Sequence, residues 1–243
     1  MPTLEWMPDR MRAPIDAAVA GVGSALGDGL IAICLIGAAA RPDRDLRANP
    51  ELLIVAEQLT AETLRTLAKG LVQPLKAGLQ IRTLTRAELR GSVDVHALEI
   101  AQWRDEHVLL AGRDPFAELD IAAGHLRHEI ERALRTLGHR LRNRLLWCLA
   151  TEQLRLDALL RESLERLSEV AHHSLRLLGQ PLPADEGAVI EAFLRWAGTE
   201  SECVLALRAR LLAEASAVDP IGELAALTAA TEAATAKVDS IAV

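Results

Sequence analysis

The chain has 243 residues, half of them hydrophobic, which is enough for one large domain or two modest domains with their own cores. Its net charge of -7 and its lack of tyrosine argue against nonspecific nucleic-acid binding through a basic surface or through stacked bases. Residues 1–14 lack the apolar run of a signal peptide, and the longest apolar stretch is too short to span a bilayer. We therefore expect a cytoplasmic protein with no membrane segment and no nucleic-acid partner.

The first half of the chain predicts a small α/β unit. Residues 14–26 predict a helix that Pro14 opens, and residues 29–37 predict a buried strand that ends at Gly37. A polar loop leads to a second buried strand at 51–57, and Thr60 is the expected cap of the next helix. Further strands are expected at 79–85 and 93–100. This order of helices and strands predicts an α/β domain over residues 1–120.

The second half is helical throughout. Apolar residues recur every three or four positions in the segments 125–149, about 152–175, 187–197, about 200–216 and about 220–240. A Gly/Pro-rich hinge occupies residues 178–187. The predicted fold class is therefore α+β: an N-terminal α/β domain with a small mixed sheet, followed by an all-α helical bundle over residues 121–243.

Two side-chain patterns allow simple expectations. Cys34, Cys148 and Cys203 lie far apart in apolar runs, which indicates small buried core residues in a reduced protein. The helix at 125–149 carries six arginines against two glutamates. It could attract an anionic ligand, or it could form a solvated face with pairs such as Glu131 with Arg135.

The segment around the first two strands resembles a known family. A strand followed by Gly37-Ala38, then residues 39–48, then Asn49-Pro50-Glu51 leading into "LLIVAE", is similar to the nucleotidyltransferase fold of DNA polymerase beta and the aminoglycoside nucleotidyltransferases. That family has Gly-Ser, a short gap and Asp-x-Asp. Residues 98–142, with the pattern HxVLxGxDPF and an arginine-rich helix, resemble bacterial nucleotidyltransferase-like proteins that continue into a helical domain.

The resemblance implies a set of site residues. Paired carboxylates hold Mg²⁺ ions that neutralise the transferring phosphates, and alternate positions on a strand place them on one face. By position, Gly37, Ala38 and Arg41 would contact the nucleotide. Glu51 and Asp94 would be the catalytic carboxylates, and Glu51, Asn49 and Asp94 would be the metal ligands. Asp94 would supply the third carboxylate from the strand expected at 93–100.

This sequence departs from the family pattern at the positions that matter most. Ala38 replaces the serine, and Asn49 replaces the first aspartate. Pro50 removes a backbone donor, so that Glu51 alone keeps a carboxylate. We therefore expect a nucleotidyltransferase-like protein with a degenerate metal site and little or no transfer, which retains nucleotide or small-molecule binding.

Two alternatives remain open. The first is an active Mg²⁺-dependent nucleotidyltransferase acting on a small hydroxylated molecule, which would use Glu51 with Asp94, or Glu51 with Asp43 and Asp45 in place of the missing ligands. The second is a structural protein whose helical bundle binds a partner or a second copy of itself. Mg²⁺ is the expected cofactor only if the protein is active. A nucleoside triphosphate, a small-molecule acceptor and a homo-oligomer are the partners that these hypotheses admit.

Overall fold

The computed structural model describes residues 4–40, 49–152 and 155–241, and it divides into two compact units, Met1–Ile121 and Ala122–Val243. The first unit contains helices α1 (Asp9–Leu26), α2 (Ala61–Lys76), α3 (Arg86–Gly91) and α4 (Ala97–Asp105), and strands β1 (Leu30–Ile36), β2 (Glu51–Ala56), β3 (Gln80–Thr85) and β4 (Val108–Gly112). Short 3₁₀ turns occupy Gly27–Gly29 and Gly37–Ala40.

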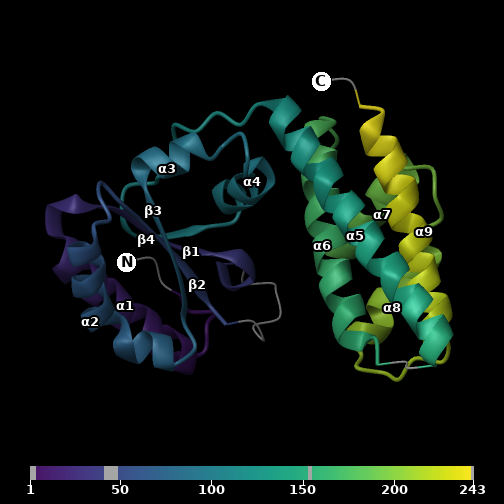
Figure 1. Ribbon diagram of the computed structural model, residues 1–243, viewed down its shortest axis with the longest axis horizontal. Coiled ribbons are helices and arrows are strands. Elements are labelled where there is room, and N and C mark those ends of the chain that lie inside the picture. Colours follow the sequence, from purple (N-terminus) through teal and green to yellow (C-terminus); the bar gives the residue numbers. More distant parts are fainter. Residues whose placement is uncertain (1–3, 41–48, 153–154, 242–243) are drawn as a thin grey trace. The chain divides into compact units, whose positions relative to one another are not determined.

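The four strands form a mixed sheet in the order β3-β2-β1-β4. β2 and β3 are parallel, whereas β1 is antiparallel to both β2 and β4. Side chains alternate between the two faces of the sheet. Ile33, Leu35, Leu52 and Ile54 pack with residues of α1 and α2 on one face, and Cys34, Leu53 and Val55 pack with residues of α3 and α4 on the other. Figure 1 shows these two pairs of helices beside the sheet. The predicted small mixed sheet is confirmed.

Helix α1 begins earlier than predicted. It starts at Asp9 and carries Pro14 inside it. Proline removes one helical hydrogen bond. Burial of Ile15, Ala18 and Val22, which pack in the core with α2, outweighs that loss and keeps the helix continuous. The start of α2 is as expected, because the Thr60 hydroxyl accepts a hydrogen bond from the Thr63 amide at 3.1 Å.

The strand predicted at residues 93–100 is wrong. Residues 92–96 form a turn in which the His96 amide donates to Ser92 O at 2.8 Å, and α4 follows at Ala97. Buried side chains recur at the helical spacing of Ala97, Ile100, Ala101 and Trp103, so packing against the sheet decides in favour of a helix. The fourth strand is β4, which lies in the segment that resembled HxVLxGxDPF.

The second unit is a bundle of helices, as predicted (Figure 1). Its helices are α5 (Ala123–Thr151), α6 (Asp157–Leu177), α7 (Glu186–Trp196), α8 (Glu202–Leu212) and α9 (Pro220–Asp239). α6 starts five residues later than expected, at 157 rather than 152. Glu152 has a φ of 57° and ends α5 in a left-handed conformation.

Helix α9 packs against α5 despite its alanine- and threonine-rich sequence. Thr228 and Thr231 are buried, and their hydroxyls donate to the carbonyls of Leu224 at 2.6 Å and Leu227 at 2.8 Å. These bonds within the helix satisfy the buried hydroxyls. Threonine can therefore take part in the core here, which explains the weak apolar pattern of this segment.

Five of the six arginines of α5 pair with acidic residues, and the sixth, Arg144, instead donates to Arg155 O at 3.3 Å and lies over the Trp147 ring. Arg132 pairs with Glu129 at 2.7 Å, and Arg140 pairs with Glu162 of α6 at 2.5 Å. Arg127 and Arg135 both contact Glu131, whose pKa is lowered chiefly by the Arg135 hydrogen bond. This pairing agrees with a solvated face of ion pairs rather than with a patch of unpaired cations.

The cysteine expectation holds for two residues of three. Cys34 and Cys148 are buried, but Cys203 is exposed near the start of α8. Val204, Leu207 and Leu211 form the buried stripe of that helix, and Cys203 lies outside it. Among the helices of the described segments, none is long and apolar enough to cross a membrane.

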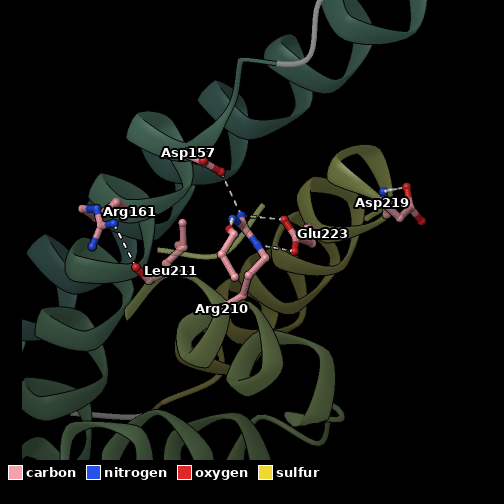
Figure 2. A network of polar contacts seen from close by, with 8 residues as sticks. Asp157, Arg161, Arg210, Leu211, Asp219 and Glu223 are labelled. Atoms are coloured by element: carbon pink, nitrogen blue, oxygen red, sulfur yellow. Dashed lines mark hydrogen bonds and ion pairs between the residues drawn. The ribbon is translucent and has the colours of Figure 1, made fainter. Parts of the chain in front are cut away.

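Arg210 joins three helices of the second unit (Figure 2). Its guanidinium contacts Glu223 at 2.7 and 2.8 Å and Asp157 at 2.9 Å, and it donates to Ala215 O at 2.8 Å. Nearby, Arg161 donates to Leu211 O at 3.0 Å. The ends of α6, α8 and α9 are thus tied together by arginine side chains.

Candidate functional site

Two of the residues predicted to form a site, Gly37 and Glu51, lie at one end of the sheet. Ile36 lies opposite Glu51 in the β1–β2 register, and Glu51 lies opposite Gln80 in the β2–β3 register. Gly37 follows β1 directly and opens the turn Gly37–Ala40 with a φ of 71°, a left-handed conformation that favours glycine. Gly37, Glu51 and Gln80 therefore lie at the same end of three adjacent strands.

An arginine lies between two carboxylates at this end of the sheet. Arg82 of β3 donates from Nε to Glu51 Oε1 at 2.9 Å and from Nη1 to Glu99 Oε1 of α4 at 2.8 Å. Alternation places Glu51 and Arg82 on the face that α4 covers. We call Arg82, Glu51 and Glu99 the Arg82 cluster.

Trp103 of α4 supports this cluster. The Arg82 guanidinium carbon lies 5.0 Å from the centroid of the Trp103 ring, and Trp103 itself is buried. Burial acts to lower the pKa of Arg82, but the hydrogen bonds and charges of Glu51 and Glu99 outweigh it and leave that pKa raised. Arg82 is therefore a permanent cation at this position.

The other predicted site residues are more dispersed. Asp94 is exposed in the turn before α4 and does not lie on a strand. It therefore cannot share a strand face as the sequence predicted. Asn49 is exposed, and a Cβ added at Gly78 would lie 3.3 Å from its Oδ1. Ala38 contributes backbone to the turn after β1. Arg41, Asp43 and Asp45 lie outside the described residues.

The donor set at this end of the sheet does not fit a pair of Mg²⁺ ions. Such ions require several carboxylate oxygens that are free to coordinate. β2 contributes Glu51 alone, and β3, the strand beside it, contributes Gln80 and Arg82 but no carboxylate. Among the described residues, no group of three or more His, Cys, Asp or Glu side chains could hold a metal ion.

Sequence reasoning missed Gln80, Arg82 and Glu99. The strand containing Gln80 and Arg82 was predicted correctly, and its two polar residues alternate with Ile81. That alternation shows that the two share a face, but the parallel pairing with β2 was needed to bring them to Glu51. Glu99 could not be placed while its segment was expected to be a strand.

A cysteine, a histidine and an aspartate also lie on the α4 face, without forming a nucleophilic site. His107 Nδ1 lies 3.0 Å from Trp103 O, so this nitrogen must donate, while Nε2 lies 3.6 Å from Asp114 Oδ1. Burial, together with the charge of Asp114, raises the pKa of Cys34 to about 12. A buried neutral thiol is unreactive, so Cys34 is a core residue rather than a nucleophile.

Comparison with solved structures identifies the class of fold. The chain has the nucleotidyltransferase-like fold, as the sequence predicted. It is similar to spectinomycin adenyltransferase AAD(9) from Enterococcus faecialis, solved with ATP and spectinomycin. The TM-score is 0.58 at 11% sequence identity, and the match covers 95% of this chain and 100% of the other. No protein family and no curated protein matches the sequence.

Proposed function

We propose that this protein is a nucleotidyltransferase-like protein that binds a nucleotide at the end of its sheet and does not catalyse metal-dependent transfer. The single observation that carries the proposal is the strand beside Glu51. In two-metal transfer, carboxylates from neighbouring strands hold the cations that neutralise developing charge. Here the neighbouring position is Gln80, and the next residue on that face is Arg82.

The binding part of the proposal rests on the extent of the fold match. The likeness to AAD(9) includes both the sheet and the helical bundle, and that protein was solved with ATP and spectinomycin. Gly37 has a positive φ, a conformation that favours glycine, at the turn beside Glu51. The absence of a side chain there allows the backbone to approach a ligand closely. A nucleotide or a small hydroxylated molecule is therefore the ligand class to test first.

Thermal unfolding tests this proposal. The protein is heated with each nucleoside triphosphate, in EDTA and separately with Mg²⁺ or Mn²⁺. A ligand at about a hundred times its dissociation constant adds about 2.7 kcal/mol to the free energy of unfolding. We expect one nucleotide to raise the melting temperature in EDTA, with no further rise when metal is added. Glu51→Gln is the matched control and should keep this shift.

Two results would contradict the proposal in different ways. A rise in melting temperature that requires Mg²⁺ or Mn²⁺ and disappears in Glu51→Gln would mean that the metal site works. No shift with any nucleotide, in either condition, would remove nucleotide binding from the proposal.

A further inference from the structure

The Arg82 cluster has the form of a cation site that already contains its cation. Glu51 comes from β2, Glu99 comes from α4, and each places one oxygen within 3 Å of an Arg82 nitrogen, at 2.9 and 2.8 Å. The two carboxylates belong to segments 48 residues apart (99 minus 51), so they are brought together by the fold rather than by sequence proximity. Both hydrogen bonds join charged groups, which makes them stronger than hydrogen bonds between neutral groups.

The partial burial of the cluster makes the guanidinium harder to replace. The side chain of Glu51 is 24% exposed and that of Arg82 is 41% exposed. The buried Trp103 of α4 lies against the guanidinium. Since Arg82 is covalently part of β3, its effective concentration at the carboxylates is far above that of a free ion.

We propose that Arg82 takes the place of the metal ion at this end of the sheet, and that it keeps divalent cations away from Glu51 and Glu99. A divalent ion that approached these oxygens could not coordinate the lone pairs that already accept hydrogen bonds from Arg82. The positive charge of the guanidinium, a few ångströms away, would also repel it. The inference rests on the proposed loss of metal-dependent transfer and gives it a specific cause. Removal of Arg82 should therefore create a cation site that the natural protein lacks.

Tb³⁺ luminescence sensitised by tryptophan measures this directly, because Tb³⁺ prefers oxygen ligands and Trp103 lies beside the cluster. We expect Arg82→Gln to bind Tb³⁺ about tenfold more tightly than the natural protein, a change of about 1.4 kcal/mol. Adding Glu51→Gln to this variant should abolish the gain. Adding Trp103→Phe should abolish the luminescence while binding persists in a calorimetric titration.

Arg82→Lys is the matched control, because it keeps the charge and should bind Tb³⁺ as weakly as the natural protein. Circular dichroism establishes that each variant is folded. Arg82→Thr provides the same test if the glutamine variant does not fold, since threonine suits a strand and already occupies positions 83 and 85 of β3.

The outcomes separate this inference from the proposed function. Equal and weak Tb³⁺ binding by the natural protein and a folded Arg82→Gln variant would overturn the role proposed for Arg82 and would leave the proposed function standing. A gain in Arg82→Lys as large as that in Arg82→Gln would also overturn it, because charge would not be the cause. Tight binding by the natural protein that depends on Glu51 would overturn the proposed function as well.

Discussion

The side chain of Arg210 connects three helices of the helical unit. Its side chain is only 12% exposed, and it contacts Glu223 twice, Asp157 once and the Ala215 carbonyl once (Figure 2). The hydrogen bonds to Glu223 and Asp157, together with their charges, raise the pKa of Arg210, so its guanidinium is charged at neutral pH. Removing one partner of a largely buried pair leaves the other charge unpaired, which costs more than the pair itself contributes.

We predict that Arg210→Ala lowers the free energy of unfolding by about 2–4 kcal/mol. The matched control is Arg195→Ala, because Arg195 is 72% exposed and pairs with Glu191 on its own helix. That change should cost at most about 0.5 kcal/mol. Urea unfolding followed by circular dichroism measures both, and equal losses in the two variants would contradict the role given to Arg210.

At the same scale, the sequence predicted Glu51 but not the residues around it. Glu51 could be proposed as a site residue because its position in a motif is local. Arg82 and Gln80 become its neighbours only through a parallel strand pairing, and the register of such a pairing follows from the assembled sheet. The loss of serine and aspartate at Ala38 and Asn49 was visible in the sequence, whereas the presence of an arginine beside Glu51 was not.

Among the elements, the contact between α1 and α2 depends on two glycines. A Cβ added at Gly21 would lie 2.9 Å from Gly70 O and 3.1 Å from Gly70 Cα. These are backbone atoms, which cannot move aside as a side chain can. Gly23, two residues further along α1, has nothing within 4 Å of an added Cβ.

This difference gives a prediction within a single helix. Gly23→Ala should raise the free energy of unfolding by about 0.5–1 kcal/mol, because alanine favours the helix more than glycine does. Gly21→Ala should lower it by about 1–3 kcal/mol, because the helices are forced apart. Thermal unfolding of both variants tests this. If Gly21→Ala were as stable as Gly23→Ala, the close approach of the two helices would be wrong.

The elements themselves were largely predictable, with one clear failure. The long helices were predicted from their apolar periodicity, and β1 and β2 from their apolar runs. β3 was also predicted as a strand, although none of its residues is fully buried. Residues 93–100 were assigned to a strand because Val93, Asp94, Val95 and His96 alternate. Four residues are too few to establish a period, and the buried face of Ala97–Trp103 follows helical spacing instead.

At the scale of the whole molecule, a shared fold and a missing sequence relationship occur together. The likeness to AAD(9) covers 95% of the chain at 11% identity, so the architecture of sheet and bundle is kept although most side chains differ. Fold is set by many residues in the cores of both units, whereas the chemistry of a site depends on a few. What this protein does therefore depends on what those few residues bind.

The most direct measurement is a calorimetric titration of Mn²⁺ into the whole natural protein and into Glu51→Gln. It requires no knowledge of the nucleotide or of an acceptor. We predict that the two titrations are the same and that neither shows binding stronger than a dissociation constant of about 1 mM. Binding in the micromolar range that is lost in Glu51→Gln would show that Glu51 belongs to a working metal site, and would contradict the account.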